Sequence, residues 1–384
     1  MANLFQQHTL EFQRRIADEN IDGALIYDPD NIYYLSAYWG YLGMQFGRPT
    51  MLFVPRSGDC TIITPSLEAE MARAMTWVED MREWTDGIGG EWFAHLRDLL
   101  SGKKNIRVGI ELFKTHPIIL ECLKHEFSKV KHVDISHILD EMRMVKTPDE
   151  IAIMRQAGQV DIAMCEAGVK AIGEGVPEYE VALAVIGGGT RKAAEFLSNE
   201  DSDRLFSPMI YNLQVLQSGR DLSMVHRRPT VRRIQMGDPV YMCFCEMVNF
   251  KHFKLGFDRE YFVATVTDEY ARIYEVALKA QAEALNSIRP GVLAEEVYAA
   301  SLEVYREAGF GICYRTGRGI GYSLIEKPEF KEGDKTPLQA GMTFAVDGAI
   351  TIPGEFGARV GDSIVVTESG FEYLTPYPKQ LRIL

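Results

Sequence analysis

The spacing of apolar and polar residues predicts a first stretch of the chain in which short strands alternate with helices. Residues 9–20 have the spacing of an amphipathic helix, and the apolar run 21–27 follows as a short strand. Further strands are expected at 50–54, 60–64 and 106–110, with helices at 66–75 and 91–101. Such alternation is typical of a compact α/β unit.

A helix start separates this unit from the rest. Thr147 suits an N-cap, Pro148 a first helical turn, and Asp149 with Glu150 a helix N-terminus. We therefore expect two domains, 1–142 and 143–384. Helices are predicted at 149–172, 177–198, 269–287 and 293–308, and strands at 238–248, 260–266, 341–351 and 361–366. This mixed order with antiparallel strands favours an α+β fold for the second domain.

The composition of the chain disfavours some classes of binding partner. The 384 residues carry a net charge of −13, which disfavours nucleic acid or an anionic membrane as a partner. A small molecule or a protein is expected instead. No apolar run approaches the roughly 20 residues of a membrane span, and the polar start does not resemble a leader, which predicts a cytoplasmic protein.

Cysteines give no evident site. The six are scattered, and the close pair Cys243 and Cys245 would lie on one face of a strand. No second pair completes a zinc site, so core thiols are expected.

One turn of the second domain lacks an expected metal ligand. The run from Thr316 to Gly321 resembles a turn of the pita-bread superfamily of methionine aminopeptidases, prolidases and creatinase, which supplies a histidine to a two-metal centre. Arg318 stands where that histidine would be. The other four ligand positions of the resemblance fall on Cys243, Gly256, Asp347 and Gly361. A guanidinium and two glycines cannot ligate cations, so the resemblance implies a site with no metal and no cofactor.

Other segments resemble creatinase, the metal-independent branch of this superfamily. They are the loop Phe46-Gly47-Arg48-Pro49, the helix start Val176–Leu183, and Gln217-Ser218-Gly219 followed by His226. The resemblance implies an α+β C-terminal pita-bread domain preceded by a smaller α/β creatinase-type domain, in a homodimer. It implies proton transfer by His226 and substrate binding by Phe46 and by Arg48, the latter donated across subunits.

The same resemblance places Asp258 and Asp347 at two catalytic glutamates, each one methylene shorter. Either aspartate could instead be structural. From the residues alone, His226 is either an acid/base residue in a polar loop or an ordinary surface histidine. Arg318 is either a buried ion-pair partner or a clamp for an anionic substrate. Asp362, next to Gly361, is expected to point to the opposite face of its strand.

The leading hypothesis is thus a metal-independent, creatinase-like hydrolase that cleaves a C–N bond of a small zwitterionic substrate bearing a carboxylate and an amidine or guanidino group. A lyase acting on a small zwitterion and a non-catalytic binding protein stay open. A metal-dependent Xaa-Pro peptidase is the least favoured alternative.

Overall fold

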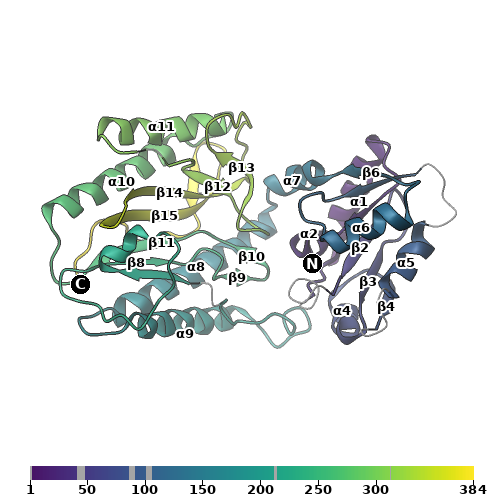
Figure 1. The fold of residues 1–384 in the computed structure, drawn as a ribbon, viewed down its shortest axis with the longest axis horizontal. Helices are drawn as coiled ribbons and strands as arrows, with labels where there is room; N and C mark the ends of the chain where they lie inside the picture. The colour runs from purple at the N-terminus through teal and green to yellow at the C-terminus, as the bar shows by residue number, and fades with distance from the viewer. Residues whose placement is uncertain (1, 41–47, 86–90, 101–105, 212–213, 312) are drawn as a thin grey trace. The chain divides into compact units, whose positions relative to one another are not determined.

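The computed structural model describes residues 2–40, 48–85, 91–100, 106–211, 214–311 and 313–384. The chain divides into two compact units, Met1–Met142 and Arg143–Leu384 (Figure 1). Each unit is built on its own large sheet.

The first unit is a mixed six-stranded sheet with the order β4-β3-β2-β1-β5-β6. The pairs β1/β5, β5/β6 and β3/β4 are parallel, whereas β1/β2 and β2/β3 are antiparallel. Helices pack on an apolar core that includes Leu25, Ile63 and Val108. The elements are α1 (Ala2–Asp18), β1 (Gly23–Ile26), α2 (Pro29–Ser36), β2 (Met51–Pro55), β3 (Thr61–Pro65), η1 (Ser66–Glu68), α4 (Ala69–Met75), β4 (Asp80–Trp84), α5 (Glu91–Leu100), β5 (Arg107–Ile110), α6 (Pro117–Glu126), β6 (Lys131–Asp134) and α7 (Ser136–Met144).

The second unit holds a larger sheet with the order β13-β12-β14-β15-β11-β8-β7, and β16 pairs with β15. All pairings are antiparallel. Its helices are α8 (Pro148–Ala171), α9 (Glu178–Phe196), η2 (Gly219–Ser223), α10 (Asp268–Ser287) and α11 (Ala294–Glu307). Its strands are β7 (Val215–Ser218), β8 (Pro239–Cys243), β9 (Asn249–Phe250), β10 (Phe253–Lys254), β11 (Asp258–Phe262), β12 (Gly317–Gly319), β13 (Glu326–Phe330), β14 (Thr343–Ile352), β15 (Phe356–Val366) and β16 (Phe371–Tyr373).

Two helix pairs cover this sheet. Helices α8 and α9 run together on one side of it, and α10 and α11 run together on the other (Figure 1). The small residues Ala277, Ala280 and Ala284 of α10 are fully buried, which allows the helix to lie close to β14 and β15. The α+β fold class is confirmed.

The predicted helix start of the second unit is confirmed in atomic detail. Thr147 Oγ1 accepts a hydrogen bond from the Glu150 backbone N–H at 3.3 Å, and the Glu150 carboxylate accepts one from the Thr147 N–H at 2.7 Å. This capping box satisfies two N–H groups that a helix start would otherwise leave unpaired. It fixes where α8 begins.

Three predicted strands have limits that are wrong by more than two residues. β11 spans Asp258–Phe262 instead of residues 260–266. β8 ends at Cys243, five residues before the expected limit, because the chain turns there. β15 begins at Phe356 instead of residue 361 and pairs with β14 from Phe356 to Val365. Gly357, Arg359 and Gly361 interrupt its apolar pattern, yet all of its residues are buried. A strand covered on both faces has no polar side to give alternation.

Among the helices that the structure describes, none combines the length and the apolar character needed to cross a membrane. Location in the cytoplasm stays a prediction.

Candidate active site

A cavity of about 620 Å³ opens in the second unit beside the centre of its sheet. Strands β8, β11, β12, β14 and β15 contribute residues to its wall, as do the segment after η2 and helix α11. Its volume lies in the range of small-molecule sites. Four residues singled out from the sequence meet there, namely His226, Asp258, Arg318 and Asp347.

The two aspartates face each other across one glycine. In the register of the sheet, Asp258 on β11 and Asp347 on β14 both pair with Gly361 on β15. A Cβ atom at Gly361 would lie 2.8 Å from Asp347 Oδ1 and would collide with Asp258 Oδ2. Glycine is therefore required at this position for both carboxylates to occupy the space above β15.

These carboxylates are incompletely satisfied. Asp258 is 5% exposed, and neither its Oδ1 nor Asp347 Oδ1 has a hydrogen-bond partner. Burial and the neighbouring charge of Asp347 raise the pKa of Asp258 well above its usual value. Unsatisfied buried carboxylate oxygens are costly for folding, so this wall of the cavity is a candidate binding surface.

Arg318 fills the space beside the aspartates. Its Nη1 forms an ion pair with Asp347 Oδ2 at 2.9 Å, its Nε donates to the Leu324 carbonyl at 3.2 Å, and its Nη2 lies 3.3 Å from Cys245 Sγ. A Cβ atom at Gly256 would lie only 2.9 Å from Arg318 Nη2. The expected ion pair between Arg318 and an aspartate is thus present.

Cys243 and Cys245 also line the cavity, so the expectation that they are core thiols is wrong. β8 ends at Cys243, and Cys245 lies in the turn that follows, which brings both thiols to the cavity wall. A hydrogen bond from Cys243, aided by Arg318, lowers the pKa of Cys245 to about 7 although burial opposes this shift. The same contact raises the pKa of Cys243. The Cys-x-Cys spacing was the available signal for these residues.

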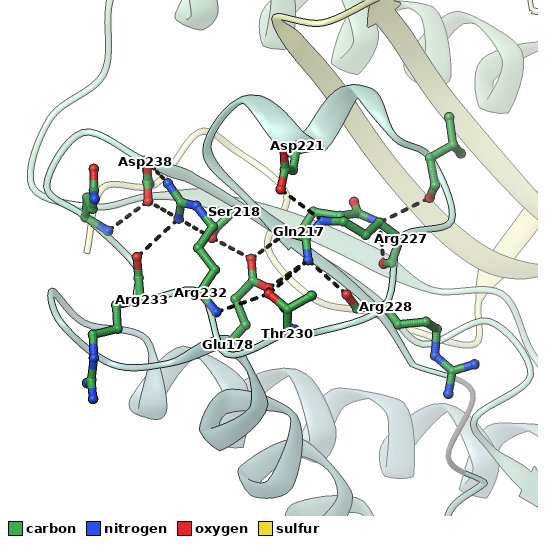
Figure 2. Close-up of polar contacts among 12 residues, drawn as sticks. Glu178, Gln217, Ser218, Asp221, Arg227, Arg228, Thr230, Arg232, Arg233 and Asp238 are labelled. Carbon is green, nitrogen blue, oxygen red and sulfur yellow. Dashed lines mark hydrogen bonds and ion pairs between the residues drawn. The ribbon is translucent and has the colours of Figure 1, made fainter.

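His226 is exposed at the cavity wall, in a turn that follows η2. Gln217 holds this turn from behind, because its Nε2 donates to the carbonyl oxygens of Arg227 at 2.7 Å and Val225 at 3.4 Å (Figure 2). These carbonyls belong to the two neighbours of His226 in the chain. The backbone on both sides of the imidazole is therefore anchored.

Glu178, at the start of α9, is the centre of the network that supports the turn (Figure 2). Its fully buried carboxylate accepts hydrogen bonds from Ser218 Oγ at 2.6 Å, from Thr230 Oγ1 at 2.8 Å, and from both terminal nitrogens of Arg227 at 2.6 and 2.8 Å. Ser218 Oγ also accepts from Arg232, which pairs with Asp238 at 2.6 Å. Gly219, the residue after Ser218, has φ +65°, a conformation that favours glycine.

Arg48, Phe46 and Asp362 are the remaining residues that the sequence singled out. Arg48 belongs to the first unit, and its role across subunits stays a prediction. Phe46 lies outside the described residues. Asp362 points away from the cavity and pairs with Arg259 at 2.6 Å, as strand alternation predicts.

The cavity does not fit a pair of divalent cations held by carboxylates and a histidine. Such a centre needs several oxygen or nitrogen donors around two ions. Arg318 instead brings a positive charge into that space, and neither Gly256 nor Gly361 offers a side chain.

The architecture and the cavity define the class of protein. A small α/β domain followed by an antiparallel sheet between two helix pairs, with charged groups gathered over that sheet, is the arrangement of pita-bread enzymes. Residues 152–368 match Metallopeptidase family M24, and residues 10–145 match the Creatinase/Prolidase N-terminal domain. The first match covers more than half of the chain, and the protein belongs to family M24.

Related chains align over nearly the full length. The "Agropine synthesis cyclase" of Rhizobium rhizogenes is 26% identical over 391 residues, which cover 97% of this chain and 96% of the relative. The "Xaa-Pro dipeptidase" of Pyrococcus furiosus is 26% identical over 375 residues, with 97% and 99% covered. The crystal structure of a dipeptidase from Pyrococcus horikoshii OT3 superposes with a TM-score of 0.84 at 26% identity, with 98% of this chain and 100% of that chain covered.

These comparisons overturn the hypothesis of a metal-independent, creatinase-like hydrolase. Xaa-Pro dipeptidases from Pyrococcus furiosus, Lactobacillus helveticus and Pyrococcus horikoshii share 26%, 28% and 27% identity with this chain. They support the peptidase alternative that the sequence favoured least. The hypothesis gave too much weight to a short motif: Gln217 and Ser218 hold a turn and do not themselves line the cavity. Such a structural role does not single out one activity.

Proposed function

We propose that the second domain hydrolyses a peptide-type C–N bond in a small substrate, with Xaa-Pro dipeptides as the first candidates. The observation that carries the proposal is the cavity where His226, Asp258, Arg318 and Asp347 converge, in a chain related along its length to Xaa-Pro dipeptidases. A cavity of about 620 Å³ suits a molecule of dipeptide size.

The charges of the cavity match the two ends of a free dipeptide. Arg228, Arg315, Arg318 and Arg359 line it, and a guanidinium group suits a carboxylate because it can donate two parallel hydrogen bonds. The unsatisfied Oδ1 of Asp347 suits the ammonium group at the other end. A substrate with both termini free is therefore preferred.

Hydrolysis needs a proton carrier and a fixed positive charge. His226 accepts a proton from the attacking water and returns it to the leaving nitrogen, a role suited to an imidazole at a cavity wall. Arg318 is held by Asp347 and the Leu324 carbonyl, so its guanidinium provides preorganised positive charge for the carbonyl oxygen as negative charge develops there.

Incubation with a panel of Xaa-Pro dipeptides, with and without added divalent cations, tests this proposal. We expect free proline from at least one dipeptide, measured by mass spectrometry, and a rate at least about 10-fold lower when the dipeptide carboxylate is amidated. Intact dipeptides throughout the panel, in the presence of folded protein and each added cation, would refute it.

A second candidate is ring closure of a small substrate. The relative named as a cyclase aligns over 97% of this chain, and Arg318 occupies a position where a metal ligand was expected. Ring closure by condensation gives a product lighter by one water, whereas hydrolysis gives products heavier by one water in total. The same mass measurement therefore separates the two reactions, and it also detects the elimination product of a lyase.

The homodimer with Arg48 donated across subunits is proposed on the resemblance of its loop alone. Light scattering coupled to size exclusion tests the dimer. Mixing Arg48→Ala chains with His226→Ala chains tests the shared site, because only mixed dimers would regain activity in one of their two cavities.

A further inference from the structure

Two thiols and one buried carboxylate meet at the wall of the cavity. Cys243 on β8 and Asp258 on β11 are direct partners in the antiparallel register, so their side chains lie on the same face of the sheet. Cys245 follows two residues later, and a backbone hydrogen bond from Phe244 to Phe257 at 2.8 Å keeps this segment against β11. One ligand atom from each of Cys243, Cys245 and Asp258 can be chosen so that all lie within 4.8 Å of one another.

We propose that Cys243, Cys245 and Asp258 bind one thiophilic divalent cation, of which Zn²⁺ is the natural candidate. A catalytic role for this cation rests on the proposed function. Binding of the cation does not, because it is measured without the hydrolysis assay. It differs from the two-cation centre that the cavity does not fit, because sulfur supplies two of the three donors.

The spacing of the donors suits such an ion. Tetrahedral zinc with bonds of about 2.3 Å to sulfur places neighbouring ligand atoms roughly 3.5–4 Å apart. The donors here need to close by about 1.3 Å at most from their spacing of up to 4.8 Å. The turn that carries Cys245 contains no regular secondary structure, so it offers the freedom for this adjustment.

The surroundings of the three donors include an unsatisfied carboxylate oxygen and a nearby positive charge. Asp258 Oδ1 is buried without a hydrogen-bond partner, which is an independent sign that a ligand is missing at this point. Two thiolates, one carboxylate and a divalent cation sum to one negative charge. Arg318, with Nη2 at 3.3 Å from Cys245 Sγ, places a positive charge beside this group, and the same guanidinium pairs with Asp347.

All three donors line the cavity, so a bound cation would face the substrate. Zinc with three protein ligands and one open position is the arrangement of catalytic rather than structural sites, where the metal acts as a Lewis acid. This site would give a family M24 chain a metal although the expected ligands are absent.

Cobalt binding tests the proposal directly. The full chain, reduced and kept anaerobic, is dialysed against Co²⁺ or Zn²⁺, and bound metal is measured by mass spectrometry and by absorption. We expect one ion per chain and a thiolate-to-cobalt charge-transfer band in the near ultraviolet. Cys243→Ser and Cys245→Ser should weaken or abolish that band, and Asp258→Asn should weaken binding about 10-fold or more.

Cys313→Ser is the matched control. Cys313 lines the same cavity but does not belong to the donor group, so its variant should keep both the metal and the band. Alkylation of the native chain provides a second measurement that does not depend on the folding of a ligand variant. Zn²⁺ should protect Cys243 and Cys245 from the reagent but leave the labelling of Cys313 unchanged.

Absence of bound metal in the reduced chain overturns the site, as does bound cobalt without the charge-transfer band. The dipeptide assay separates this failure from that of the function. Metal bound through sulfur without hydrolysis keeps the site and rejects the function, whereas hydrolysis by a chain that binds no metal does the reverse.

Discussion

The two faces of the sheet at β11 and β15 differ in how completely their charged groups are hydrogen-bonded. On one face, the five N–H donations of Arg259 reach Asp362, Asp258 O, Gly361 O, Tyr377 O and Pro378 O at 2.6 to 2.9 Å. Asp362 also accepts hydrogen bonds from Gln281 at 3.0 Å and Lys379 at 3.2 Å. On the cavity face, Oδ1 of Asp258 on β11 and Oδ1 of Asp347 on the neighbouring strand β14 have no hydrogen-bond partner.

Adjacent residues of one strand thus serve different purposes. A satisfied network of buried charges fixes one arrangement of the chain, whereas unsatisfied groups cost stability and are retained where a ligand completes them. The face of Arg259 holds the sheet together, and the face of Asp258 is the proposed binding surface. The following experiments measure how far this division holds.

Replacement of Arg259 by methionine should have the largest effect. It leaves Asp362 and several carbonyls without their buried donor, which typically costs about 3–5 kcal/mol of unfolding free energy. Urea denaturation measures this loss. The control is Arg155→Met in the same unit, whose ion pair with Glu372 is about half exposed and should cost less than about 1 kcal/mol. Equal costs for the two variants would contradict the comparison.

Replacement of His226 by alanine should reduce kcat by about 100-fold or more and leave stability unchanged. The imidazole is exposed, and its turn is held by Gln217 through backbone carbonyls that the substitution retains. Dipeptide hydrolysis and thermal unfolding of the same preparation check both statements. His125→Ala, an exposed histidine of the first unit, should change neither quantity. A His226→Ala chain with full activity would remove this residue from the mechanism.

Glu326 is a buried, ion-paired carboxylate outside these two faces. The pH dependence of its contribution to stability tests whether a paired charge stabilises the fold. Burial alone would raise its pKa, but Arg143 and Lys146 outweigh burial and lower the pKa from 4.5 to about 2. Because the folded-state pKa lies below the unfolded value, its stabilising contribution is fully present above about pH 4.5 and is lost as the pH falls towards 2.

The variant Glu326→Gln should therefore lose on the order of 1–3 kcal/mol at neutral pH and approach the parent chain near pH 2. Urea denaturation at several pH values measures the difference. A difference that does not shrink in acid would mean that the ion pairs contribute nothing through the charge of Glu326.

Asp258→Asn should have the smallest effect on folding among the substitutions of buried charged residues, within about 1 kcal/mol, because an unsatisfied oxygen is exchanged for a neutral amide of the same shape. Asp362→Asn is the corresponding substitution on the opposite face of the sheet. It should cost about 1.5–3 kcal/mol because it weakens charged hydrogen bonds. Chemical unfolding of both variants at neutral pH gives the comparison. If Asp258→Asn proves the more destabilising of the two, the division between the faces is wrong.

Local patterns predicted much of the fold. Thr147 to Glu150 carry their own capping groups, and α10 and α11 show long amphipathic repeats, so these elements were placed within one or two residues. The start of β15 was missed because a strand buried on both faces has no alternation. Strand alternation nevertheless placed Asp362 correctly on the face away from the cavity.

The sequence by itself determined the family frame, the helices of the second domain and the loss of the expected metal ligands at Arg318, Gly256 and Gly361. Only the tertiary structure decided what replaces them. The meeting of Cys245 with Asp258 depends on where β8 ends and on which strand lies beside it. Those choices follow from packing between residues distant in the chain, which a local pattern does not record.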